Sequence, residues 1–208
     1  PTGITTDELS LTFDSDGIDT PNTSDVTLAI GEDNTAQDFG YVSPECLTDD
    51  CKVTTFEAYL VNKGWDLDGV INGVIDPAPE VATIKHLDIK GKNLRDLNGI
   101  EYFTGLETLI ADDNEIEAVD LKQNVNLKHL SLKYNDIVGI NVRNNILLEE
   151  LHLEGNKLTE IDVSNALIMK HLGLRYNNIK ILDVRPLTEL KSLETSYNKI
   201  EQLLLGSN

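Results

Sequence analysis

Basic residues are missing from the first quarter of this sequence, and long apolar runs are missing throughout. Residues 1–51 hold twelve acidic side chains and no Lys or Arg, and the 208 residues carry a formal net charge of −19. Such acidity repels phosphate and anionic lipid, so neither nucleic acid nor an anionic membrane is an expected partner. No apolar run approaches the ~20 residues that a membrane span requires, so no membrane insertion is expected.

The sequence also lacks an initiator methionine and a signal peptide, since it opens on Pro1. We therefore expect a processed chain or a fragment, with further domains upstream. The apolar run Leu203–Leu205 has no polar cap, so we expect more chain or another molecule to cover that end. Ser–His–Asp arrangements, phosphate-cradling glycine loops and isolated carboxylate pairs are missing too, so no enzyme is expected.

What is present is one pattern written five times. Leu106, Leu127, Leu148, Met169 and Leu190 each begin a unit, and the spacing from one to the next is always 21 residues. Apolar residues recur at positions 1, 4, 6, 11 and 14 of the units, and the one exception is Thr195 at position 6 of the last unit. A sixth unit, longer by a single residue, precedes them from Ile84 and has Lys92 at position 9. In the other five units, position 9 is always Asn: Asn114, Asn135, Asn156, Asn177 and Asn198.

This L-x-x-L-x-L-x-x-N-x-L pattern resembles a leucine-rich repeat. The same residues predict the fold physically, because alternate side chains of Leu-x-x-Leu-x-Leu point inward from a short strand. Stacked units share one core, so we expect an α/β solenoid with short parallel strands and few helices. The Asn column is expected to form a ladder that satisfies buried backbone groups. A unit this short leaves room only for extended or 3₁₀ turns opposite the strands.

Residues 1–44 predict β structure, with strands at Glu8–Phe13, Val26–Ile30 and Gln37–Val42 parted by turn residues. The run from Phe13 to Asn22, followed by Gly31–Asn34 and Asp38–Val42, resembles the end of an SdrD B-like repeat. That resemblance implies the tail of a β-sandwich module of bacterial surface proteins.

Oxygen-rich clusters in this tail have two interpretations. Asp14, Asp16 and Asp19 surround Gly17, and Glu32, Asp33 and Asp38 form a second group. Calcium prefers such loops, and no cofactor other than calcium is expected. Solvated Asp-Gly turns are the alternative.

Residues 45–53 form a linker that contains both cysteines, Cys46 and Cys51. With no histidine nearby, a disulfide is expected between them in preference to a metal or redox pair. Residues 54–83 are expected to cap the solenoid, beginning with a helix over Phe56–Lys63 that starts at Thr54/Thr55 and ends at Gly64. The repeats then occupy residues 84–208.

The segment after the predicted helix partly matches a calcium loop. Asp66, Asp68 and Asn72 fall at ligand places of an EF-hand, but the first and last ligands are missing, so a structural loop is the alternative. The run Phe56–Asn72, with the segments Leu87–Lys92 and Asp96–Phe103, resembles the cap and first repeat of secreted bacterial leucine-rich proteins such as internalins. That resemblance implies export, often by type IX secretion.

The outward strand positions predict a concave working face. Positions 2 and 7 alternate in charge along the repeats, which predicts cross-strand ion-pair ladders. The candidate ligand-binding residues are all on this face. They are Tyr134, Tyr176 and Tyr197 at position 8, His129 and His171 at position 3 with Glu150 between them, and His152 at position 5. The tyrosines could equally cover the edge of the sheet.

We therefore expect a non-catalytic module that binds a protein or a surface glycan, within a multidomain bacterial protein at the cell surface or outside the cell, in an adhesive role. The alternatives are a passive spacer and a calcium-stabilised adhesin module.

Overall fold

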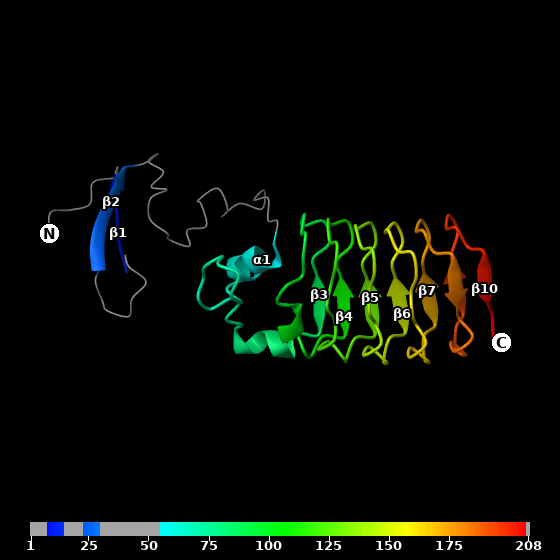
Figure 1. The fold of residues 1–208 in the computed structure, drawn as a ribbon. Helices are drawn as coiled ribbons and strands as arrows, with labels where there is room; N and C mark the ends of the chain where they lie inside the picture. Colours follow the sequence, from blue (N-terminus) through cyan, green and yellow to red (C-terminus); the bar gives the residue numbers. More distant parts are fainter. Residues whose placement is uncertain (1–7, 15–22, 30–54, 207–208) are drawn as a thin grey trace. The chain divides into compact units, whose positions relative to one another are not determined.

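The computed structural model describes the backbone of residues 8–14 and 23–29, and residues 55–206 with their side chains. The chain forms two units, residues 1–42 and residues 43–208 (Figure 1). Several sequence-based predictions lie outside the described residues. They are the strand Gln37–Val42, the cysteine pair Cys46 and Cys51, and the acidic groups Asp16, Asp19, Glu32, Asp33 and Asp38, together with the side chain of Asp14.

The first unit contains an antiparallel pair of strands. Strand β1 spans Glu8–Asp14 and strand β2 spans Thr23–Ala29, with Glu8 opposite Ala29 and Asp14 opposite Thr23. Strand β1 matches the predicted strand Glu8–Phe13, whereas β2 begins three residues before the predicted strand Val26–Ile30. The assignment of this unit to a β-sandwich tail stays a prediction.

The first described element of the second unit is helix α1, Phe56–Lys63, at the predicted place. The Thr55 side chain accepts a hydrogen bond from the backbone N–H of Ala58, which satisfies a donor that the first turn leaves unpaired. Gly64 ends the helix in the left-handed conformation, with φ of 68°. Helix α1 therefore begins and ends at the residues that its local sequence predicts.

Aromatic rings attach this cap to the first coil of the solenoid. Phe56 is fully buried and packs on Tyr59 and Phe103, with ring centroids 5.8 Å apart in both pairs. Trp65 meets Phe103 edge-on at 5.7 Å. Two 3₁₀ helices complete the connection, η2 at Pro79–Thr83 and η3 at Ile100–Tyr102. In the described ranges, no helix is long and apolar enough to cross a membrane.

The repeats build a six-stranded parallel sheet in the order β3-β4-β5-β6-β7-β9 (Figure 1). The strands are short: β3 His86–Asp88, β4 Thr108–Ile110, β5 His129–Ser131, β6 Glu150–His152, β7 His171–Gly173 and β9 Ser192–Glu194. The leucines at position 4 lie in register across the whole sheet, from Leu87 to Leu193. One repeat unit thus becomes one coil, and equal positions become neighbours.

Outside this sheet the coils are mostly irregular, apart from η3 in the first coil and a pair of short strands in the last two. There β8, Ile181–Asp183, pairs in parallel with β10, Gln202–Leu204. Of the extended or 3₁₀ turns expected opposite the strands, these coils have the extended form. At the last coil, Leu203 and Leu205 are 38% and 63% exposed.

The core is a single apolar stack, and its only regular polar members among the described residues are asparagines. Each Asn at position 9 bonds across two coils. Asn156 Oδ1 accepts the backbone N–H of Ile137 at 3.0 Å, while Nδ2 donates to the carbonyls of Leu132 at 2.8 Å and Leu153 at 3.1 Å. The same pattern recurs at Asn114, Asn135, Asn177 and Asn198.

A second, shorter set of buried asparagines was not foreseen. Asn124 and Asn145, both at position 19, are completely buried. Asn145 Nδ2 donates to the carbonyls of Leu121 and Asn124, and Asn124 Nδ2 donates to those of Ile100 and Phe103. The signal was present in the sequence as two asparagines one period apart, but Ala166 and Leu187 interrupt the column.

Replacing Asn156 by Leu should lower the free energy of unfolding by about 2–4 kcal/mol, because one buried N–H and two carbonyls lose their partner. Urea denaturation of the intact chain measures this. Asn144→Leu is the matched control, since Asn144 is exposed and makes one long bond of 3.4 Å to Lys122. That variant should stay within about 0.5 kcal/mol of the parent. Equal effects of the two substitutions would contradict the ladder as the structural support.

Candidate functional site: the sheet face and its tyrosine rim

The outward face of the six-stranded sheet, called the sheet face below, is formed by positions 2, 3, 5 and 7 of each coil. Position 4 points into the core, whereas positions 3 and 5 are partly or fully exposed in most strands, as in the pattern of β4 and β5. This is the face that the sequence predicts to be concave. Position 8 follows at the edge where each strand has ended, and its side chains form a rim.

Position 2 forms a ladder of ion pairs along part of the sheet. Glu107 lies between two lysines, with its carboxylate oxygens 2.9 Å from Lys85 Nζ and 2.7 Å from Lys128 Nζ. Lys170 pairs with Glu149 in the same column. The hydrogen bonds from Lys128 and Lys85 hold the pKa of Glu107 at about 2, below its ordinary 4.5. This column matches the predicted alternation of charge.

Position 7 does not form the expected ladder. Asp112 accepts the Ser131 hydroxyl at 2.6 Å and the backbone N–H of Lys133 at 2.9 Å, so its carboxylate is already satisfied. Arg175 reaches Glu194 at position 5 instead, at 3.6 Å. Within residues 55–206, no ion pair joins two consecutive position-7 side chains. The prediction was wrong here because hydroxyl, backbone and diagonal partners compete with the neighbour directly across the strand.

Histidines and glutamates form a connected chain at the centre of the sheet face. Glu150 Oε2 lies 3.3 Å from His129 Nδ1 and 3.9 Å from His152 Nε2. His152 Nδ1 lies 3.3 Å from Glu154 Oε1. His171 is the register partner of Glu150 on the next strand. The structure thus brings together the predicted residues His129, Glu150 and His152 and places His171 beside them.

Glu154 extends this chain, although it was not among the predicted ligand-binding residues. Its carboxylate leans across the next coil and lies over Gly173, where any Cβ would collide with it. Burial pushes the pKa of Glu154 up, but hydrogen bonds from His152 and from its own backbone N–H outweigh this, and the pKa lies below its ordinary value. The clue was the glycine at position 5, which leaves room for a neighbour.

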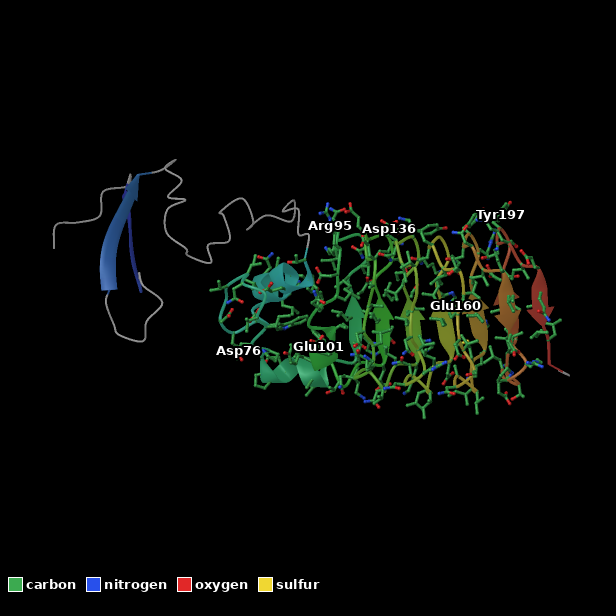
Figure 2. All side chains as sticks on the ribbon, viewed as in Figure 1. Asp76, Arg95, Glu101, Asp136, Glu160 and Tyr197 are labelled. Atoms are coloured by element: carbon green, nitrogen blue, oxygen red, sulfur yellow. The ribbon has the colours of Figure 1, made fainter. Side chains whose placement is uncertain are left out.

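The three tyrosines form an exposed rim beside the sheet face. Tyr176 and Tyr197 stack, with ring centroids 4.4 Å apart and planes inclined by 6°. The Tyr134 ring lies against the backbone of Gly155, and it therefore covers a coil that has no side chain at position 8. Figure 2 shows Tyr197 at the upper edge of the solenoid, the same edge as Asp136 and Arg95. The rings therefore make one aromatic row along this edge.

Position 8 has an unusual backbone in all six coils. Its φ is positive at every one: Gly91 (64°), Asp113 (56°), Tyr134 (52°), Gly155 (71°), Tyr176 (57°) and Tyr197 (58°). Glycine and aspartate tolerate this left-handed conformation, but for a side chain such as tyrosine it costs about 1 kcal/mol. The tyrosines remain 46–67% exposed.

The candidate calcium loop of the cap is held by hydrogen bonds of its own. Asp66 is buried, accepts the backbone N–H of Asp76, and has its pKa raised by burial. Asp68 accepts from the backbone N–H of Val70 and from the Asn72 amide. Glu57 on α1 receives the backbone N–H groups of Asn72 and Gly73. Calcium binding there stays a prediction, and residues 55–206 contain no group of three or more His, Cys, Asp or Glu arranged to hold a metal.

Three solved structures similar to this chain are bacterial leucine-rich-repeat proteins. The functional domain of InlJ from Listeria monocytogenes, which includes a cysteine ladder, gives a TM-score of 0.58 with 34% identity over 60% of this chain. An internalin, InlF, from Listeria monocytogenes gives 0.54 with 30% identity over 61%. A leucine-rich-repeat protein of Leptospira interrogans gives 0.51 with 27% identity over 54%.

This chain spans 28%, 39% and 31% of those three chains, in the same order. No protein-family model and no curated protein sequence matches it. The solenoid is a leucine-rich-repeat fold, and its structural neighbours include internalins. Its own ladder consists of asparagine, since the repeats contain no cysteine.

The Glu107 ladder predicts a specific pH dependence. Because the folded-state pKa is depressed from 4.5 to about 2, the stabilisation is present above 4.5 and is lost as the pH falls toward 2. Glu107→Gln should therefore be less stable than the parent at pH 6 and nearly equal to it at pH 2, by urea denaturation. Glu117→Gln is the control, because Glu117 is exposed and makes no ion pair in the described part. A Glu107 deficit that persists undiminished at pH 2 would exclude the ladder as its cause.

Proposed function

We propose that this chain is a non-catalytic binding module whose tyrosine rim and sheet face hold a partner protein or a surface glycan. The observation that carries the proposal is the pairing of strain with exposure at position 8. Tyr134, Tyr176 and Tyr197 adopt a backbone conformation that glycine or asparagine adopts at lower cost, and they leave about half of their surface in water. Strained, exposed residues of this kind gather at functional sites.

The chemistry of the rim suits recognition. Tyrosine offers a rigid apolar ring and a hydroxyl, and it is enriched among the residues that dominate binding energy. Arg175 lies 5.6 Å from the centre of the Tyr176 ring, which adds a cationic group at the same place. The row is held by the sheet, so little ordering entropy is lost when a partner binds.

A shallow surface favours a macromolecular partner over a small substrate. Five strand spacings of ~4.8 Å make the sheet face roughly 24 Å broad, which fits a protein loop or a short glycan. A hollow in the described solenoid lies elsewhere, on the opposite side, lined by Glu160, Ile161, Asp162, Ile181 and Pro186. Binding of a macromolecule needs no catalytic residues such as the Ser–His–Asp arrangement of a hydrolase.

The setting of the module is part of the proposal. Similarity to internalins, together with the SdrD B-like sequence of residues 1–44, supports a multidomain bacterial protein at the cell surface or outside the cell, in an adhesive role. Export by type IX secretion is the route that the sequence of the cap suggests. A calcium-stabilised adhesin module is a variant of the same function. The alternative function is that of a passive spacer, for which the rim tyrosines would have no role.

Tyr176→Asn should weaken binding at least tenfold, a loss of about 1.4 kcal/mol, because it removes an anchor ring and the stack on Tyr197. The free energy of unfolding should stay within about 0.5 kcal/mol or rise, because asparagine tolerates the left-handed backbone. Protein and glycan arrays probed with the labelled intact chain identify ligands. Titration of each ligand then compares the variants, and urea denaturation measures their stability.

Leu167→Asn is the matched control, since this leucine is 54% exposed and lies outside the strands and the rim. It should leave binding unchanged. A passive spacer predicts that neither substitution changes any interaction. Normal binding by Tyr134→Asn, Tyr176→Asn and Tyr197→Asn alike would therefore refute the proposed site.

A further inference from the structure

All four histidines of the chain lie on the sheet face. His86, His129 and His171 occupy position 3 of strands β3, β5 and β7, and His152 occupies position 5 of β6. Histidine is the side chain whose charge ordinarily changes between pH 5 and 8. Every side chain of this type is therefore gathered on the surface to which the binding role has been assigned.

The other charges of the sheet face cancel. Seven basic and seven acidic side chains occupy positions 2, 3, 5 and 7 of the six coils. The basic ones are Lys85, Lys90, Lys128, Lys133, Lys170, Arg175 and Lys191. The acidic ones are Asp88, Glu107, Asp112, Glu149, Glu150, Glu154 and Glu194. With neutral histidines the face carries no net charge, and with protonated histidines it carries +4.

Each histidine has charged neighbours on the adjoining strands. His86 has Asp88, Lys85 and Lys90 on its own coil and Glu107 and Asp112 on the next. His129 is paired with Glu150, and Lys128, Glu107 and Glu149 flank it. His152 contacts Glu150 and Glu154, with Lys133 and Arg175 on the adjoining coils. His171 has Glu150 on one side and Lys170, Lys191 and Glu194 on its own coil and the next.

The paired carboxylates can accept the charged rings without rearrangement. Glu150 lies between His129 and His152, and Glu154 already meets the other nitrogen of His152. Protonation turns these contacts into ion pairs within the face. The side chains of His129 and His152 are still 43% and 30% exposed, so their new charge reaches solvent.

We propose that the sheet face binds a short acidic peptide segment of its partner once these histidines are protonated. This rests on the proposed binding function of the same face and adds the chemistry of the partner and its regulation by protons. Positive charge meets a carboxylate-bearing segment at low pH, and the attraction disappears as the face becomes neutral at higher pH.

The extent of the charge favours a short peptide over a long polyanion. The sheet face is roughly 24 Å broad, which an extended segment of about seven residues spans. Outside the sheet face, residues 55–206 carry seventeen acidic and nine basic side chains. A nucleic acid that extended past the face would be repelled there, whereas a peptide confined to it would not.

The test uses the intact chain and two rhodamine-labelled heptapeptides, one alternating Glu with Gly and one alternating Gln with Gly. Fluorescence anisotropy at low salt gives the affinity of each peptide at about pH 7.5 and pH 5.5. The Glu peptide should bind at least roughly tenfold more tightly at the lower pH, and the Gln peptide should show no such change.

Two double variants separate the histidines from general effects of pH. The variant His129→Gln with His152→Gln removes the two paired rings. The variant His86→Gln with His171→Gln removes two rings that have no bonded partner in the described structure, so it should fold normally. Each should reduce the pH effect, and the quadruple variant should abolish it. Tyr176→Asn should leave the ratio between the two pH values unchanged.

A Glu-peptide affinity that does not change with pH in the parent chain would overturn this inference. So would a pH effect that survives in the quadruple variant or appears equally with the Gln peptide. None of these results would contradict binding at the tyrosine rim. Normal binding of ligands by all the rim variants would instead refute the proposed function of the rim. The ratio of Glu-peptide affinities at the two pH values tests the histidines independently of that result.

Discussion

Each short coil must turn inside the protein without leaving its buried backbone N–H and C=O groups unpaired, and the asparagine ladder supplies the missing partners. Asn177 shows how it does so: its oxygen accepts the N–H of Leu158 in the preceding coil, while its amide donates to Leu153 in that coil and to Leu174 in its own. One short side chain thus satisfies three buried groups and links two coils. Apolar packing stabilises the stack, but packing alone would not fix where each coil turns.

This fixed register makes equal sequence positions into spatial neighbours, and the properties of the sheet face follow from that. Lys85, Glu107 and Lys128 belong to three successive coils and are far apart in sequence, yet they form one continuous set of ion pairs. The same rule collects the histidines on one surface and the tyrosines on one edge. A rigid grid of this type suits a binding surface, because its side chains are placed before the partner arrives.

Local departures from the repeat shape the surface further. Gly155 and Gly173 stand where other coils carry larger side chains, and a neighbour uses each space: Tyr134 leans over the first and Glu154 over the second. Tyr134 therefore covers the coil between itself and the stacked pair Tyr176 and Tyr197, and the histidine chain ends on a partly buried carboxylate. The backbone is left-handed at position 8 of all coils, and glycine adopts this conformation at the lowest cost. The conformation itself therefore does not explain why three coils have tyrosine there.

The sequence by itself determined the solenoid, the parallel register, the capped helix Phe56–Lys63 and the asparagine ladder. Each depends on local preference or on a strict period, which one chain displays in full. The same period placed the histidines on the sheet face and the tyrosines along its edge. Only the tertiary structure decided which neighbour each side chain chose, such as Arg175 with Glu194 rather than Glu154. Several partners lie within reach of a long charged side chain, and the choice among them depends on the space that glycines, hydroxyls and backbone groups leave.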